Sequence, residues 1–351
     1  MYVGLVLSNN KWFCPYVNYY LKIFDALNIN YNIISWNRDG TEQGLLQYDE
    51  MCDGRASLFK YLCYLKHVIK TVRKEKFDKL VILCPVMTIL LTPFLWYYYN
   101  KRYIVDYRDL SIDQNIYLKY IFLFSLKHSA ANIISSPGFI PYLPKGLKYI
   151  LSHNFDYSKV IDVLKSNNTL SSNNSEIIDV LTIGGIRDYD SNIQVIDALG
   201  NKKGFNLRFV GKGIASGMLE EYVKKKGYKN VQFIGFYKKD EEASYIESAT
   251  FINIYYPRKD SHDSALSNRF YNSLIYRKPM ITTAGTTQGN YASYHKVGVA
   301  IENCNKLDSI LLSYKHSIDY INFSENANKL LAVFVDDYKK FSKTIVNFCE
   351  N

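Results

Sequence analysis

The sequence of 351 residues lacks three local patterns that would assign it to a common class of protein. Its six cysteines form no CxxC pair and have no spacing against histidine that is typical of a zinc site. The first predicted strand is followed by SNNKWF, so the GxGxxG fingerprint of a dinucleotide dehydrogenase is missing. The start, MYVGLVLSNNKWF, has no basic segment and no small-residue cleavage site that would indicate a signal peptide. We therefore expect a cytoplasmic protein without a bound metal or a redox cofactor.

Charge is also missing from residues 80–99, a run long enough to span a bilayer. Two prolines, Pro85 and Pro93, interrupt this run, which favours a buried strand followed by a buried helix. The composition, 48% hydrophobic and 22% charged, is typical of a globular protein rather than of a disordered or polytopic one.

Basic residues are in excess, with a formal net charge of +10, and residues 1–165 carry 20 Lys+Arg against 13 Asp+Glu. This balance favours a phosphate-bearing ligand, an anionic membrane or nucleic acid as partner, although solubility alone also explains it. A predicted helix over residues 58–76 has a basic stripe made of Lys66, Lys70, Arg73 and Lys74. The stripe indicates a peripheral contact with anionic lipid, and a simple solvated helix face is the alternative interpretation.

Short apolar runs alternate with amphipathic stretches along the chain, which predicts an α/β fold with parallel sheets. The length exceeds what one hydrophobic core usually serves, roughly 250 residues, so we predict two Rossmann-like domains facing across a cleft. A polar tract, SNNTLSSNNSE, is the best candidate for a linker between them. The predicted organisation is a first domain over residues 1–157, a linker over 158–176, a second domain over 177–332 and a C-terminal helix over 333–351 that packs back across the junction.

Three predicted strands of the second half end in glycine where a helix is about to begin, in LTIGGIRD, RFVGKG and QFIGFY. Glycine there lets backbone N–H groups and the helix dipole approach a phosphate closely, although it also serves ordinary turn geometry. The residues that these turns offer to a ligand are Gly184, Gly185, Gly211, Gly213, Phe236 and Tyr237.

The segment SNRFYNSLIYRKPMITTAGTT, residues 267–287, predicts a helix, a Lys-Pro turn, a strand and a Gly/Thr loop. Together with the three glycine turns, this order resembles the C-terminal domain of GT-B glycosyltransferases, particularly the family 4 retaining enzymes. NSLIYRKPMI covers the family's "EAMACGKPVI", and SHNFDYSKV is similar to the segment that opens its second domain. The resemblance runs over residues 150–300, whereas VDYRDL carries a weaker similarity in the first half.

This resemblance implies a nucleotide-sugar donor site in the second domain, to which Asn268, Asn272, Thr286 and Thr287 would contribute beside the glycine turns. The family's paired glutamates fall on Ser264 and Asn272 here, with Asp260 or Asp263 as substitutes for the first. The Asn272 amide still offers hydrogen bonds to ribose hydroxyls. Negative charge develops on the leaving diphosphate, and we predict that Arg187 and Arg269 stabilise it in place of a metal.

The acceptor is predicted to bind at the carboxyl ends of strands in the first domain, where ligands of α/β folds bind. The candidates there are Asn9, Asn10, Lys11, Asp106, Arg108 and Asp109. Asp106 or Asp109 would take a proton from the acceptor hydroxyl, and a structural ion-pair cluster is the alternative role for this Asp-Arg-Asp run.

The predicted function is transfer of a hexose-type sugar from a nucleotide sugar to a glycan or lipid-linked glycan, in bacterial surface or capsular polysaccharide synthesis. The enzyme would act in the cytoplasm or at the inner face of the cell membrane. Two alternatives remain open, a nucleotide-sugar epimerase of the same fold and a non-catalytic protein that binds a polyanion or a glycan. No RNA- or DNA-binding motif is present, so nucleic acid is not an expected partner.

Overall fold

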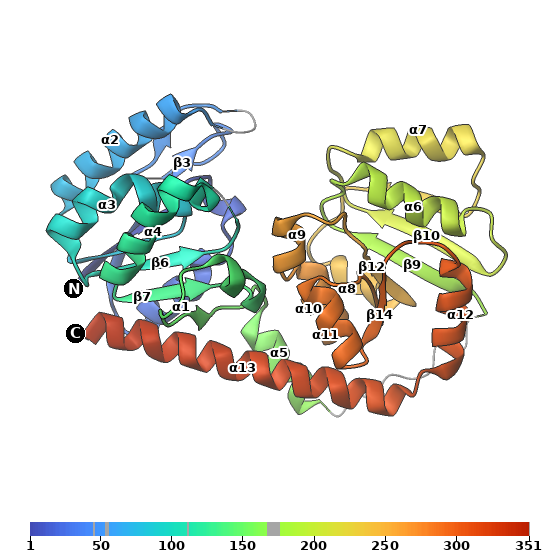
Figure 1. Ribbon diagram of the computed structural model, residues 1–351. Helices are drawn as coiled ribbons and strands as arrows, with labels where there is room; N and C mark the ends of the chain where they lie inside the picture. The colour runs from blue at the N-terminus through green and yellow to red at the C-terminus, as the bar shows by residue number, and fades with distance from the viewer. Residues whose placement is uncertain (45, 53–55, 111, 167–175, 351) are drawn as a thin grey trace. The chain divides into compact units, whose positions relative to one another are not determined.

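A computed structural model describes residues 1–44, 46–52, 56–110, 112–166 and 176–350. The chain forms two compact units, each built on a parallel sheet with helices (Figure 1). Unit 1 is Met1–His153 with Asp337–Asn351, and unit 2 is Asn154–Asp336. The predicted class, two Rossmann-like α/β domains, is confirmed by these sheets. Of the predicted linker, residues 158–165 belong to helix α5 (Tyr157–Lys165), and residues 167–175 lie outside the described residues.

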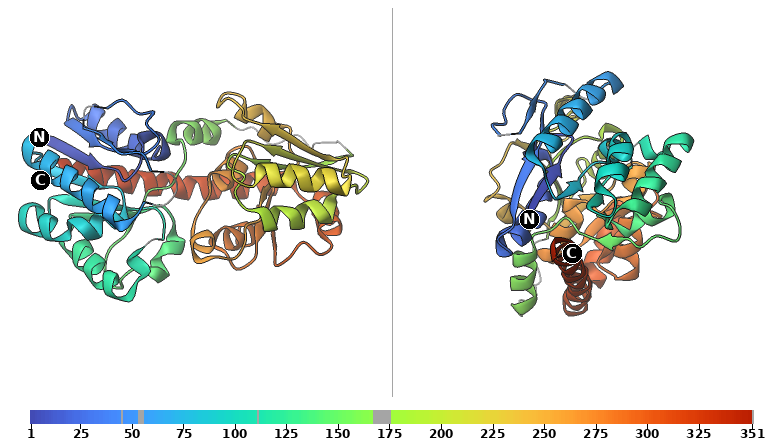
Figure 2. Two further views of the ribbon diagram at one scale, coloured as in Figure 1. Left: turned by 90° about the horizontal axis from the view of Figure 1, so that it is seen from above. Right: turned by 90° about the vertical axis from the view of Figure 1, so that its left-hand side faces the viewer.

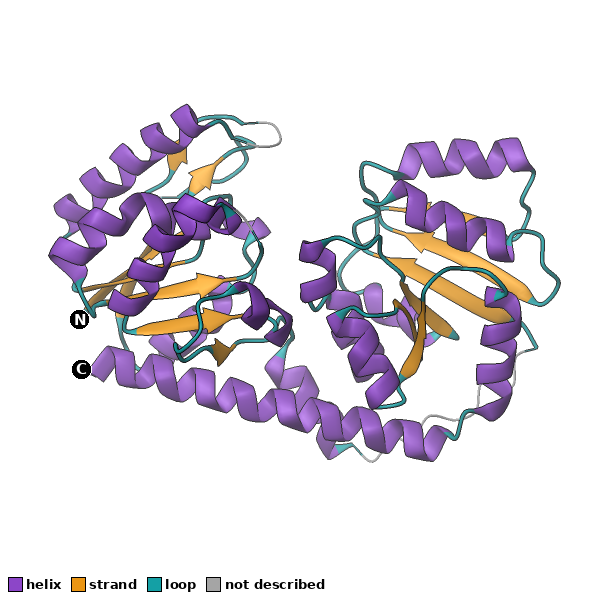
Figure 3. Ribbon diagram, in the orientation of Figure 1, coloured by secondary structure: helices purple, strands orange, loops and turns teal. Residues whose placement is uncertain are grey.

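The sheet of unit 1 has six parallel strands in the order β2-β1-β5-β6-β7-β8. Helices pack beside the strands, as Figure 2 and Figure 3 show. Its strands are β1 (Tyr2–Val6), β2 (Asn30–Ile34), β5 (Lys79–Ile82), β6 (Tyr103–Tyr107), β7 (Ala131–Ile134) and β8 (Ile150–Leu151). A separate short pair joins β3 (Trp36–Asn37) to β4 (Tyr48–Asp49). Strands β5 and β6 are buried along their whole length, as expected for central strands covered by helices on both faces.

The charge-free run of residues 80–99 forms strand β5 and helix α3, as the prolines predicted. Pro85 is the first residue of α3, where a missing N–H costs nothing, and Pro93 lies inside the helix. Among the described residues no helix is both long and apolar enough to cross a membrane. The other helices of unit 1 are α1 (Val17–Ala26), α2 (Leu58–Glu75) and α4 (Ile116–His128), with α3 spanning Pro85–Tyr99 and short 3₁₀ turns at η1 (Lys11–Phe13), η2 (Ile112–Gln114) and η3 (Pro137–Tyr142).

Unit 2 repeats this architecture with six parallel strands in the order β11-β10-β9-β12-β13-β14. They are β9 (Ile178–Ile183), β10 (Phe205–Val210), β11 (Val231–Gly235), β12 (Phe251–Ile254), β13 (Met280–Thr283) and β14 (Gly298–Ile301). The helices that follow α5 are α6 (Tyr189–Leu199), α7 (Ser216–Lys226), α8 (Glu242–Glu247), α9 (Asp260–Ser264), α10 (Asn268–Ile275), α11 (Thr287–Tyr294) and α12 (Leu307–Ser317).

The last helix, α13 (Tyr320–Glu350), contributes to both units. It begins at Tyr320, before the predicted start at residue 333. Its final turns put Phe341, Ile345 and Phe348 into the hydrophobic core of unit 1. Its earlier turns belong to unit 2, where Phe334 packs against Tyr271 with ring centroids 5.7 Å apart.

Candidate functional site

A pocket of about 390 Å³ lies at the carboxyl edge of the unit 2 sheet. Because all six strands are parallel, the loops that follow them gather at one edge, which is the usual ligand-binding edge of an α/β sheet. Its lining comes from the loops after β9, β11 and β12 and from helices α8 to α11. Seven residues predicted from the sequence are among those that line it: Gly184, Gly185, Arg187, Tyr237, Asn268, Arg269 and Asn272.

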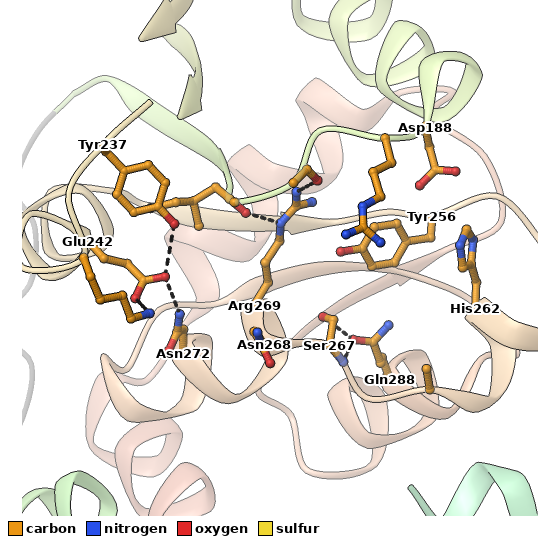
Figure 4. Close-up of a pocket in the computed structure, with 16 residues that line it drawn as sticks. Asp188, Tyr237, Glu242, Tyr256, His262, Ser267, Asn268, Arg269, Asn272 and Gln288 are labelled. Atoms are coloured by element: carbon orange, nitrogen blue, oxygen red, sulfur yellow. Dashed lines mark hydrogen bonds and ion pairs between the residues drawn. The ribbon is translucent and has the colours of Figure 1, made fainter. Parts of the chain in front are cut away.

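Arg269 stands at the centre of this pocket and is held by three backbone carbonyls (Figure 4). Its guanidinium donates to the carbonyl oxygens of Ile183 at 2.5 Å, Gly185 at 3.0 Å and Asn253 at 3.3 Å. The residue is 8% exposed, with its carbon Cζ 5.6 Å from the ring centroid of Tyr256. Carbonyl oxygens carry only partial charges, so this arrangement fixes the guanidinium in place without neutralising its positive charge.

Arg187 supplies a second guanidinium to the pocket, from the loop between β9 and α6. Its residue is exposed, and within the described residues no hydrogen bond or ion pair holds its side chain. One arginine of the pocket is therefore fixed and the other is available to a ligand. Together they make this part of the pocket attractive to a phosphate group.

The opposite sign of charge lies on one side of Arg269, where Glu242 of α8 meets Tyr237 and Asn272 (Figure 4). A carboxylate oxygen of Glu242 accepts from the Tyr237 hydroxyl at 3.3 Å and from the Asn272 amide at 3.5 Å. The second oxygen pairs with the ammonium group of Lys239. Burial raises the pKa of Tyr237 to about 12, and Glu242 adds to the rise, so the phenol stays protonated and donates. Sequence reasoning missed Glu242, because it follows no motif and lies on a short helix.

Asp188, Tyr256 and His262 lie on the other side of Arg269 (Figure 4). The ring of His262 is 5.4 Å from that of Tyr256, and its Nδ1 lies 3.2 Å from the carbonyl oxygen of Pro257. The pocket therefore has a polar acidic end, a cationic middle and a second polar end. Asp263, a predicted substitute for a family glutamate, is held by Arg258 at 2.9 Å.

Helix α10 begins at the pocket and is positioned by a side-chain cap. The Ser267 hydroxyl accepts from the backbone N–H of Phe270 at 3.3 Å and donates to the buried Gln288 at 2.7 Å. Asn268 and Arg269 form the first turn, which places backbone N–H groups and the positive end of the helix dipole beside the pocket. Gln288, from α11, was not among the sequence candidates.

Gly211 and Gly213 do not line the pocket but support its β9 loop from behind. A Cβ on Gly211 would lie 2.2 Å from the carbonyl oxygen of Gly184, and one on Gly213 would lie 2.2 Å from that of Ile186. Gly211 also has a φ of +117°, which side chains rarely adopt. Their role in this structure is close packing of two loops.

The remaining donor-site candidates also lie outside the residues that line the pocket. Thr286 is buried and caps α11 by accepting from the N–H of Gly289 at 3.0 Å, and Thr287 is the first residue of that helix. Phe236 is 82% exposed, with the Lys212 ammonium 5.2 Å from its ring centroid.

In unit 1, the Asp-Arg-Asp run after β6 is largely a buried ion-pair cluster. Asp106 is fully buried, and its carboxylate accepts from Arg108 at 2.8 and 2.9 Å and from the Tyr20 hydroxyl at 2.7 Å. Burial lowers the pKa of Arg108, but the Asp106 carboxylate outweighs burial and the pKa is raised overall. Asp106 has no access to an acceptor hydroxyl in this arrangement, so its contacts favour the structural role. Asp109 is exposed at the same edge and stays the predicted base.

Asn10 is fully buried as well and ties the loop after β1 to the β3–β4 pair. Its amide donates to Asn37 at 3.0 Å and to Asp39 at 2.7 Å, and its oxygen accepts from the N–H of Arg38 at 2.9 Å. These bonds use the polar atoms of the side chain inside the protein, which argues against contact with an acceptor. Asn9 is partly exposed and Lys11 is exposed, so both stay predictions for acceptor binding.

Comparison with known proteins identifies the fold through solved structures. No protein-family model matches the chain, and no curated protein sequence matches it either. Sucrose-phosphate synthase from Thermosynechococcus elongatus is similar with a TM-score of 0.74 and 12% identity, covering 98% of each chain. HepE of Anabaena, solved in complex with UDP, is similar with a TM-score of 0.66 and 12% identity over 99% of each chain.

A third similar structure is the UDP-GlcNAc 2-epimerase from Methanocaldococcus jannaschii, with a TM-score of 0.57 and 12% identity. The match covers 95% of this chain and 99% of that one. Identities this low establish the fold alone. The chain has the GT-B fold that its sequence predicted.

Proposed function

We propose that this protein is a glycosyltransferase that binds a nucleotide-sugar donor in the pocket of unit 2. The observation that carries the proposal is the order of charges along the pocket: Glu242 at one end, Arg269 in the middle, and Asp188 and His262 at the other end. Arg187, next to Asp188 in the chain, adds a second guanidinium to the lining. The groups of a nucleotide sugar follow a matching order: ribose hydroxyls that hydrogen-bond to a carboxylate, a diphosphate that pairs with guanidinium groups, and a sugar that hydrogen-bonds to polar side chains. HepE, which shares the fold, was solved with UDP.

In this proposal Glu242 accepts hydrogen bonds from the ribose hydroxyls, and Asn272 adds an amide that donates or accepts. The family that the sequence resembles has a glutamate at position 272. Here the carboxylate comes from α8 and contacts the Asn272 amide, so the neighbouring helix restores the missing charge.

The diphosphate lies against Arg269, Arg187 and the first turn of α10 in this proposal. During transfer the bond between the anomeric carbon and the diphosphate oxygen breaks, and its electron pair stays with the diphosphate. The acceptor hydroxyl oxygen bonds to the anomeric carbon, and the hydroxyl proton passes to a base. Fixed guanidinium groups and helix N–H groups stabilise the charge that develops on the leaving group. Asp109 is the predicted base, and a glycan of the bacterial surface stays the predicted acceptor.

Calorimetry with UDP-, GDP-, ADP- and CMP-sugars tests donor binding directly. We expect one nucleotide class to bind, and Arg187→Ala to weaken binding roughly 10-fold or more, because a charge-assisted contact to phosphate is lost. Lys225→Ala, at an exposed lysine in the last turn of α7, is the matched control and should leave affinity unchanged. Absence of heat and of a thermal shift with every donor would overturn the proposal.

An epimerase is the second candidate, favoured by the similarity to the UDP-GlcNAc 2-epimerase and by the polar groups Asp188 and His262 at one end of the pocket. The two activities differ in their need for an acceptor. An epimerase converts the bound sugar to its epimer when no acceptor is present, whereas a transferase returns the donor unchanged or hydrolyses it slowly. Analysis of the sugar after incubation with donor alone separates them.

A further inference from the structure

A surface of unit 1, far from any residue of the unit 2 pocket in sequence, exposes large apolar side chains on two packed helices, α3 and α4. Tyr97 is 74% exposed at the end of α3, and Tyr117 and Tyr120 are 80% and 70% exposed on α4. The helices join at Trp96 and Phe124, whose ring centroids are 5.8 Å apart. We call this the α3–α4 surface, formed by Trp96, Tyr97, Tyr98, Ile116, Tyr117, Tyr120, Ile121 and Phe124.

Helix α4 has more apolar side chains than the rest of unit 1 covers. Only Phe122, Ser125 and Leu126 of the helix are buried, although most of its residues are apolar. A helix on the outside of a soluble domain normally turns one apolar stripe inward and a polar face outward. Helix α4 instead keeps apolar side chains on its outer face, and contiguous patches of this kind mark interaction sites.

Lysines surround the aromatic groups, and acidic residues are absent from this part of the chain. Helix α3 has no charged residue, and residues 114–155 contain no Asp or Glu. A surface pocket of about 420 Å³ beside Tyr120 is lined by Lys119, Lys127 and Lys145. In the described part of the chain, none of these three ammonium groups forms an ion pair.

Two nearby cations, Lys101 and Arg102, are already hydrogen-bonded to backbone carbonyls and are less available to a partner. The ammonium of Lys101 donates to the carbonyl oxygens of Lys127 and Ser129, and Arg102 donates to the carbonyl oxygen of Tyr98. They satisfy carbonyls at the ends of α4 and α3, which is the usual role of a cation at a helix C-terminus. The charge that the surface offers to a partner is therefore that of Lys119, Lys127 and Lys145.

We propose that the α3–α4 surface docks the protein on a bilayer that contains anionic phospholipid. Tyrosine and tryptophan concentrate at the headgroup level of membranes, where the ring is in an apolar layer and the polar atom reaches water. The three lysines lie where they contact lipid phosphates, and a negatively charged leaflet attracts them. Helix α4, Ile116–His128, is too short to cross a bilayer and lies in the interface plane.

The positive charge of the α3–α4 surface favours an anionic lipid bilayer, rather than a second copy of this chain, as its partner. Two copies joined through this surface would bring lysines of both copies together without an acidic group between them. The basic stripe of α2 predicted from the sequence is the other cationic candidate in unit 1, but its Arg73 lies over the rings of Phe94 and Tyr98 at 5.7 and 5.6 Å. The proposal assigns lipid contact to α4 and needs none from α2.

Flotation with vesicles tests the assignment, using phosphatidylcholine alone and an equal mixture of phosphatidylcholine and phosphatidylglycerol. We expect the full chain to float with the mixed vesicles and to stay behind with the neutral ones. Lys119→Ser/Lys127→Ser/Lys145→Ser should weaken partitioning roughly 10- to 100-fold at low salt, because each lysine near the leaflet contributes attraction. Tyr117→Ser/Tyr120→Ser should weaken it at all salt concentrations, since it removes the inserted rings.

The matched control is Lys66→Ser/Lys70→Ser/Lys74→Ser, which removes the same charge from α2 and should float like the wild type. Circular dichroism and donor binding verify that each variant is folded, and the latter also keeps this test separate from that of the proposed function. The proposal is overturned if the wild type floats with neither vesicle, or if only the α2 variant loses binding. It is also overturned if the wild type is a dimer that the tyrosine variant dissociates, because the surface then joins two copies.

Discussion

The two units share an α/β architecture but differ in what the polar side chains at the carboxyl edge of the sheet contact. Each has a sheet of six parallel strands, and each presents arginine and acidic or amide groups at the carboxyl ends of its strands. In unit 1, Arg108 pairs with Asp106, which is fully buried, and the Arg108 side chain is only 10% exposed. In unit 2, Arg269 closes on backbone carbonyls and keeps its charge for the pocket. The comparison teaches that a polar group at the right edge serves a ligand only when its partners in the protein leave its charge unneutralised.

The largest effect should come from breaking the buried pair of unit 1. Asp106→Ala leaves the Arg108 guanidinium buried without its carboxylate, which costs about 3–5 kcal/mol of unfolding free energy. Urea unfolding monitored by circular dichroism measures the loss. The double variant Asp106→Leu/Arg108→Met should recover most of the stability, and a double variant as unstable as the single one would contradict a role limited to structure.

The next effect should come from the glycine contact behind the β9 loop of unit 2. Gly211→Ala places a Cβ against the Gly184 carbonyl and strains the backbone at a φ of +117°, which costs about 1–3 kcal/mol. Because the β9 loop carries Gly185 and Arg187, we expect donor affinity to fall although residue 211 does not line the pocket. Gly217→Ala, where a Cβ meets no neighbour, is the control in the same unit. Unchanged donor binding in Gly211→Ala would show that the loop tolerates the shift.

The two pocket arginines should respond differently to replacement by lysine. A single ammonium group cannot reach the three carbonyls that Arg269 holds, so Arg269→Lys should lower stability by about 1–2 kcal/mol and weaken donor binding. Arg187→Lys should weaken donor binding while leaving the melting temperature unchanged, since no internal contact is lost. Equal melting temperatures for both variants would remove the distinction between a fixed and an available guanidinium.

The smallest effect should be seen at the acidic end of the pocket. Glu242→Gln replaces a charged acceptor by a neutral one, and we expect donor affinity to fall roughly 3- to 10-fold. Affinity for inorganic pyrophosphate, which has no ribose, should not fall. Glu220→Gln, on the exposed part of α7, controls for the loss of one negative charge. An equal loss of pyrophosphate and donor affinity would place Glu242 near the phosphates instead.

Strands and their order in the chain were predictable because each depends on a short apolar run with a turn residue after it. The charge-free run of residues 80–99 predicted a strand followed by a helix, which are β5 and α3, and the glycine that follows β9 is where the LTIGGIRD motif put it. The pair β3–β4 was missed, since two-residue strands have no periodicity of their own. Among the site residues, the pattern led to Arg187 and Arg269 but also to Thr286, whose hydroxyl is used as a helix cap.

The sequence by itself determined the two α/β lobes and the loops at which a ligand would be found, because alternating apolar runs and strand-end glycines are local signals. Tertiary structure decided which polar residues of those loops face a pocket. Glu242 reaches Asn272 only through the packing of α8 beside α10, and Asp106 is closed off only because Tyr20 and Arg108 converge on it. The contacts of Glu242 with Asn272 and of Asp106 with Tyr20 join residues far apart in the chain, and the energy of all these pairings depends on burial, which no local pattern encodes.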